Sequence, residues 1–68
     1  MKSFTPKEII ELLLKNGFEL LRTKGSHQIF IHRENNLRTV VPMHHKDLKK
    51  GTLHGILKQA GIDLDNVL

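Results

Sequence analysis

A chain of 68 residues, 38% of them hydrophobic, is long enough for one small domain, and it contains no cysteine. A disulfide framework and a thiolate metal site are therefore excluded, and the composition suits a reducing cytoplasm. Charged residues closely flank the longest aliphatic run, residues 12–14, so we expect neither a signal peptide nor a membrane span. The net charge of +4 favours a polyanionic partner, nucleic acid above all, and the alternative is an ordinary soluble surface with an excess of cations.

The first element in the chain is a predicted helix that ends at Asn16 and Gly17. Thr5 can serve as its N-cap, and Glu8 completes a capping box. Gly17 supplies the left-handed conformation that often ends a helix, which would let Phe18 pack back on the last turn. Apolar residues recur at helical spacing and predict one buried stripe, made of Ile9, Ile10, Leu13 and Leu14.

Three strands are predicted next, over residues 18–23, 27–32 and 37–41. Turn-forming residues separate them at positions 24–26 and 34–36, and Pro42 ends the third strand. The first strand is expected to place Phe18, Leu20 and Arg22 on one face. In the second strand, alternation leaves open which face is buried; we favour the face of Phe30 over that of Ile29. Connections this short predict an antiparallel sheet.

A polar loop over residues 44–50 leads to a second predicted helix, which begins near Gly51. Gly61 would end this helix, and Ile62 would pack back on it. The tail at 63–68 has room for one more helical turn. In the second predicted helix, four apolar residues at the spacing i, i+3, i+4 and i+7 form the buried stripe: Leu53, Ile56, Leu57 and Ala60.

The order of elements, α-β-β-β-α, predicts one α+β domain over residues 1–68. Its two helices would cover one face of a three-stranded antiparallel sheet and leave the other face for a partner. Four residues should then lie buried between the helices and the sheet: Leu13, Leu53, Ile56 and Leu57.

Short motifs in a specific order give the chain a family resemblance. They are Gly17-Phe18, Arg22, Lys24-Gly25-Ser26-His27, Phe30, Val41-Pro42-x-His44, Gly51-Thr52-Leu53, Ile56-Leu57 and Gln59-Ala60-Gly61. In this order the motifs resemble the HicA (YcfA-like) family of mRNA interferase toxins, over nearly the whole chain. The resemblance implies a double-stranded-RNA-binding-like fold, metal-independent and ribosome-independent cleavage of mRNA, and neutralisation by a HicB-type antitoxin in a type II toxin–antitoxin system. It gives the catalytic role to His27 alone.

The residue types around His27 suit the same chemistry. RNA carries its own nucleophile, the 2′-hydroxyl, so a cleaving enzyme needs mainly proton transfer and charge stabilisation. Imidazole exchanges protons near neutral pH, and Lys24 would offset charge on the phosphorane. The alternative for His27 is a structural histidine at the start of a strand. The candidate RNA contacts are Arg22, Lys24, Ser26, Gln28, Lys46, Lys49 and Lys50. Arg33 and Arg38 are further candidates for contacts with phosphate.

Other functions compete with cleavage. Adjacent His44 and His45 lack the spacing of a helical metal site, so we expect no metal or other cofactor and interpret His44 as a loop-fixing or RNA-contacting residue. The phenylalanines are assigned to the core, which leaves recognition of RNA backbone and shape. A non-catalytic RNA-binding module of the same fold is the main alternative, whereas a pure protein-interaction domain would leave the basic charge unexplained. An antitoxin should be acidic where it contacts this chain.

Overall fold

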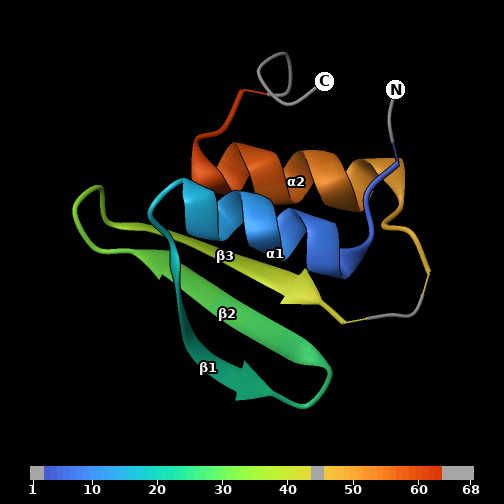
Figure 1. The fold of residues 1–68 in the computed structure, drawn as a ribbon, viewed down its shortest axis with the longest axis horizontal. Helices are drawn as coiled ribbons and strands as arrows, with labels where there is room; N and C mark the ends of the chain where they lie inside the picture. The colour runs from blue at the N-terminus through green and yellow to red at the C-terminus, as the bar shows by residue number, and fades with distance from the viewer. Residues whose placement is uncertain (1–2, 44–45, 64–68) are drawn as a thin grey trace.

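The computed structural model describes residues 3–43 and 46–63 and contains five elements (Figure 1). They are α1 (Pro6–Lys15), β1 (Glu19–Lys24), β2 (His27–His32), β3 (Leu37–Pro42) and α2 (Lys50–Ala60). The strands form one antiparallel sheet in the order β1-β2-β3. The predicted α+β class and the order α-β-β-β-α are confirmed. His44 lies outside the described residues, so its predicted role is not tested. The expected extra turn at 63–68 also lies outside them, except for its first residue, Asp63.

Both ends of α1 form as predicted. The Thr5 hydroxyl accepts a hydrogen bond from the Glu8 N–H at 3.2 Å, and the Glu8 carboxylate accepts one from the Thr5 N–H at 2.9 Å. At the other end Gly17 has φ +90°. The Phe18 N–H donates to the Leu13 carbonyl at 3.0 Å, which returns the chain toward the core.

The second helix, α2, begins at Lys50, one residue before the predicted start, and it ends as predicted. Gly61 has φ +68°, and the Ile62 N–H donates to the Leu57 carbonyl at 2.9 Å. The start of α2 is different, because its N-cap residue, Lys49, makes no side-chain capping hydrogen bond. None of the described helices is long and apolar enough to cross a membrane.

A bulge in β1 overturns one expectation about the sheet. Leu20 is paired with Phe30, but the register shifts between Leu20 and Arg22, and Arg22 is paired with Ile29. Because Phe30 and Ile29 lie on opposite faces of β2, Leu20 and Arg22 do too. The prediction that they share a face was therefore wrong.

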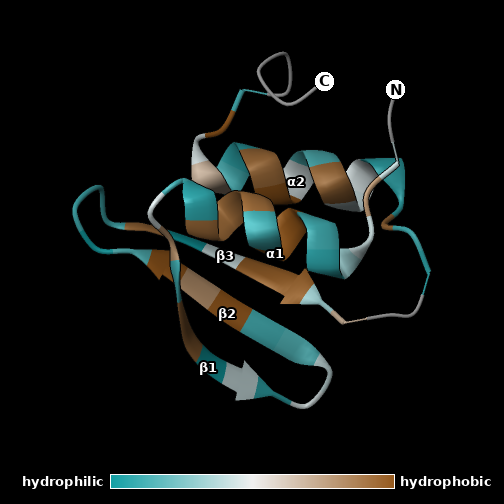
Figure 2. Ribbon diagram, viewed as in Figure 1, coloured by the Kyte–Doolittle hydropathy of each residue, from teal (hydrophilic) through white to brown (hydrophobic). Residues whose placement is uncertain are grey.

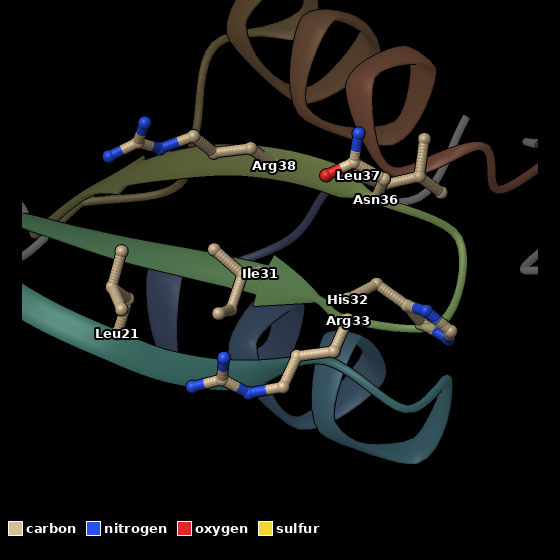
Figure 3. Close-up of a pocket in the computed structure, with 7 residues that line it drawn as sticks. All are labelled: Leu21, Ile31, His32, Arg33, Asn36, Leu37 and Arg38. Carbon is tan, nitrogen blue, oxygen red and sulfur yellow. The ribbon is translucent and has the colours of Figure 1, made fainter.

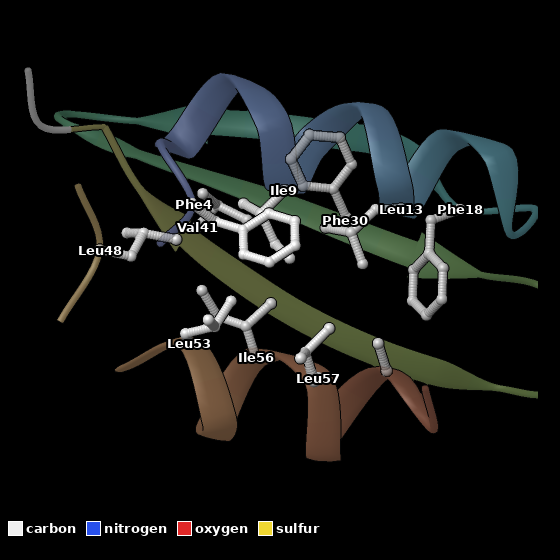
Figure 4. Close-up of a cluster of buried hydrophobic side chains, with 11 residues drawn as sticks. Phe4, Ile9, Leu13, Phe18, Phe30, Val41, Leu48, Leu53, Ile56 and Leu57 are labelled. Carbon is white, nitrogen blue, oxygen red and sulfur yellow. The ribbon is translucent and has the colours of Figure 1, made fainter. Parts of the chain in front are cut away.

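The core lies between the sheet and the two helices, which cover the same face (Figures 1 and 4). Phe30 is only 1% exposed, as predicted, and the four residues expected between the layers are buried. Thr39 joins this core on β3, and its hydroxyl donates to the Gln59 side chain of α2 at 2.9 Å. The cluster consists of Phe4, Ile9, Leu13, Phe18, Phe30, Val41, Leu48, Leu53, Ile56, Leu57 and Ala60.

The opposite face of the sheet has no helix on it, and we call it the open face. His27, Ile29 and Ile31 lie on it, because they alternate with Phe30 along β2. Ile29 is only 8% exposed even though it lies outside the core cluster. Both faces of β2 are therefore partly buried, whereas every residue of β1 is exposed.

Candidate active site

His27 is the first residue of β2 and directly follows a two-residue turn. Gly25 is the first residue of this turn and has φ +58°, and a positive φ at this position is typical of the two-residue turns that join antiparallel strands. His27 is paired with Lys24 on β1 and with Pro42 on β3. The sheet thus fixes its backbone on both sides, while its side chain remains exposed on the open face.

Two of the predicted RNA contacts share this end of the open face with His27. Lys24 is directly opposite His27, and Arg22 is opposite Ile29, the next residue along β2 on the same face. The bulge in β1 is what brings Arg22 to this face. The hairpin therefore places one imidazole and two cationic side chains together, all of them exposed.

Ser26 and Gln28 lie on either side of His27 but in different surroundings. The Ser26 carbonyl accepts a hydrogen bond from the Met43 N–H at 2.6 Å, so the chain leaving β3 passes beside the turn. Gln28 is half-buried and is paired with Thr23 and Val41, which places it on the face toward the helices. The structure therefore separates Gln28 from His27.

The three predicted lysine contacts lie in the segment that leads into α2. Lys46, Lys49 and Lys50 are exposed, whereas Leu48 between them is buried and its N–H donates to the Phe4 carbonyl at 2.7 Å. This segment and the β1–β2 turn lie at the same end of the molecule (Figure 1). The end of β2 next to the turn is hydrophilic as well (Figure 2).

The start of α2 adds to the positive potential at this end. Its first turn contains no acidic residue, and Lys49 and Lys50 stand where the helix dipole favours negative charge. Cations at a helix N-terminus are unfavourable in isolation, and a bound phosphate would offset this. The segment is consequently suited to an anionic partner.

The described residues suit proton transfer and phosphate binding. No group of three or more histidine, cysteine or acidic residues within 3–43 and 46–63 could hold a metal ion. His27 makes no hydrogen bond with another described side chain. Two pockets on the surface lie around His32 and Arg33, at the far end of β2, and His27 lines neither of them. The candidate site is therefore an exposed surface and not a pocket.

Comparison with known protein families shows that this chain is a toxin of a bacterial toxin–antitoxin system. The family described as "HicA toxin of bacterial toxin-antitoxin" matches residues 6–62. The chain therefore belongs to the HicA toxin family, as its motifs predicted. A search of curated proteins found no match.

The sequence indicates Arg33 and Arg38 as candidate phosphate contacts, but it does not show that they lie next to Leu21 and Ile31 on the open face. Leu21, Ile31, Arg33 and Arg38 come together there from three strands and from the turn after β2. The sequence shows each of them as an isolated apolar or basic residue. Only the strand register, including the bulge at Leu21, shows that they are neighbours.

Proposed function

We propose that this chain is an endoribonuclease toxin that cleaves mRNA, with His27 as the proton-transferring residue. The observation that carries the proposal is the pairing of His27 with Lys24 across a two-residue turn, on a face where both side chains are exposed. Membership of a toxin family gives this arrangement a biological role. The target would be mRNA in the cytoplasm, and a HicB-type antitoxin would hold the toxin inactive.

The proposed reaction uses the 2′-hydroxyl of RNA as its nucleophile. His27 takes the proton from this hydroxyl as the 2′-oxygen bonds to phosphorus. The bond from phosphorus to the 5′-oxygen breaks, and the leaving oxygen takes a proton from solvent. Lys24 and Arg22 stabilise the negative charge that develops on the phosphate oxygens. The products are a 2′,3′-cyclic phosphate and a 5′-hydroxyl, with no metal in the reaction.

RNA binding would extend from the hairpin to the lysine segment. Lys46, Lys49 and Lys50 are exposed at the same end of the molecule as the β1–β2 turn. Ser26, which lies in that turn, is exposed as well. Phosphate contacts fix a nucleic acid in place without reading its sequence. We therefore expect the RNA backbone to cross this end of the protein with one phosphate beside His27.

One observation favours the alternative, an RNA-binding module without catalysis. Imidazole bases in enzymes are often oriented by a hydrogen bond to a third group, and His27 has no such partner among the described residues. A binding module would retain the cationic surface and would not depend on His27. The two proposals differ in whether RNA is cut.

The test compares the wild type with His27→Ala and with His54→Ala, which removes another exposed histidine, on α2. A positioned acid–base group contributes about 10²- to 10⁴-fold, so His27→Ala should lose that much cleavage while RNA affinity changes little. His54→Ala should cleave normally, EDTA should have no effect, and the fragments should have the ends given above. A wild type that binds RNA and never cuts it would establish the alternative.

A further inference from the structure

The open face has a pocket at the end of β2 far from His27. Its volume is about 310 Å³, and Leu21, Ile31 and Arg38 line it from three neighbouring strands (Figure 3). Arg33 lines it from the turn after β2. The proposed cleavage chemistry uses none of these residues.

Aliphatic side chains line part of the pocket and continue beyond it along the open face. Leu21 is 42% exposed and Val40 is 38% exposed. They lie on either side of Ile29, since Val40 is paired with Ile29 and Leu21 is in the bulge next to it. Exposed apolar side chains that adjoin one another and are rimmed by polar residues are typical of a protein-binding surface.

The two arginines at the rim differ in their interactions. The Arg33 side chain forms an ion pair with Glu19. Arg38 is exposed and forms no ion pair with any other described residue. The planar donors of an unpaired guanidinium can bind both oxygens of a carboxylate. Because Leu21 and Ile31 line the same pocket, Arg38 is suited to a carboxylate with an apolar side chain near it.

We propose that this pocket anchors the antitoxin. An acidic segment of that protein would place an apolar side chain over Leu21 and Ile31 and a carboxylate on Arg38. This inference rests on the partnership with an antitoxin and is independent of the cleavage mechanism. The charge of +4 makes an acidic partner complementary and a second copy of the chain repulsive.

RNA is a poorer occupant of the same pocket. The chain has three phenylalanines and neither tyrosine nor tryptophan, and all three phenylalanines are in the core. Nucleic-acid bases that bind to a sheet usually stack on aromatic side chains. Leu21 and Ile31 offer a base no such partner, and the His32 ring, which also lines the pocket, is already packed against Phe18. The two aliphatic side chains readily accept a leucine, valine or phenylalanine from a protein.

A partner anchored at this pocket would also cover His27. Ile31 is four residues from His27 along β2, which corresponds to about 13 Å at about 3.3 Å per residue. A usual protein interface buries about 800 Å² on each partner. Because the molecule measures only 29 × 29 × 17 Å, an interface of that size on the open face is large enough to cover the pocket and His27 together.

The experiment takes the product of the gene next to that of this chain as the candidate antitoxin. Its affinity is measured for the wild type, Arg38→Glu, Leu21→Ser and the control Lys58→Glu, which makes the same charge change on α2. We expect Arg38→Glu and Leu21→Ser to bind at least about 10-fold more weakly, because residues at the centre of an interface contribute most of its affinity. Lys58→Glu should change the affinity by less than about 3-fold, which is typical of exposed charges away from an interface.

Several outcomes would overturn the proposal. The first is that Arg38→Glu and Lys58→Glu bind the candidate antitoxin with equal affinity. The second is that the candidate antitoxin does not bind the wild type. A larger loss of RNA cleavage in Arg38→Glu than in Lys58→Glu would assign the pocket to RNA. Self-association of the wild type that Leu21→Ser abolishes would assign it to a second copy. Absence of RNA cleavage by the wild type would refute the proposed nuclease and leave the affinity result unchanged.

Discussion

Lys24 and His27 are opposite each other in the β1–β2 ladder, and only Gly25 and Ser26 separate them in the chain. Directly opposite residues of an antiparallel pair have Cβ atoms about 4.5–5.5 Å apart on one face of the sheet. The backbone therefore places the two side chains next to each other on the open face. A phosphate that binds to Lys24 is held next to the proposed base.

The first prediction concerns this pair. Lys24→Ala should lower the rate of RNA cleavage at saturating toxin by about 10²- to 10³-fold, the usual effect of removing a group that stabilises charge in the transition state. Lys24→Arg should retain more activity because it keeps the positive charge. The measurement is a single-turnover rate with toxin in excess over a short RNA.

Lys58→Ala is the control for this series, since it removes a lysine from the exposed surface of α2. It should cleave at the wild-type rate. A Lys24→Ala variant that needs more toxin for saturation but then cleaves at the full rate would contradict a role in the transition state. Lys24 would then be a phosphate contact only.

The second prediction concerns the lysine segment before α2. Each phosphate contact to a single strand contributes about −0.7 to the slope of log affinity against log salt concentration. Lys49→Ala should therefore make this slope shallower by about 0.7, and Lys58→Ala should leave it unchanged. The measurement is RNA affinity over a series of salt concentrations, with the His27→Ala variant as background so that the RNA stays intact. Equal slopes for the two lysine variants would remove the segment from the RNA interface.

The ends of the helices were predictable because their signals are local in the sequence, whereas Leu14, which was predicted in the buried stripe of α1, is 52% exposed. The capping box at Thr5 and Glu8 and the glycine at position 17 fixed α1 to within one residue. Gly61 did the same for the end of α2. Each of these signals depends on residues within one or two turns of helix, so no knowledge of the sheet was needed.

The faces of the sheet were less predictable because they depend on pairing between strands. Nothing in residues 18–24 announces the bulge at Leu21, which moves Arg22 to the open face. The burial of Ile29 depends on neighbours from β1 and β3, so alternation along β2 left the choice between Ile29 and Phe30 open. The pocket was not predicted for the same reason. The position of His27 at the start of β2 was predicted because a local turn sets it.

The last prediction compares two glycines that both have positive φ. A Cβ atom at Gly25 would meet nothing within 4 Å, whereas one at Gly17 would lie 2.7 Å from Nε2 of His32. A left-handed conformation costs a residue with a Cβ atom about 1–2 kcal/mol. Gly25→Ala should lose about that much unfolding free energy, and Gly17→Ala should lose more because of the added steric conflict. Urea unfolding of both variants measures the difference.

His32 provides the means to separate the two costs at Gly17. Its ring packs edge-on against Phe18, with centroids 5.2 Å apart, and its Nδ1 accepts the Asn35 N–H at 3.2 Å, so the ring is held against Gly17 from two sides. In the double variant Gly17→Ala/His32→Ala, the steric conflict is gone and the backbone cost remains. The double variant should therefore be more stable than the sum of the two single losses predicts. Additive losses would mean that the ring moves aside freely, and Gly17→Ala should then be no more harmful than Gly25→Ala.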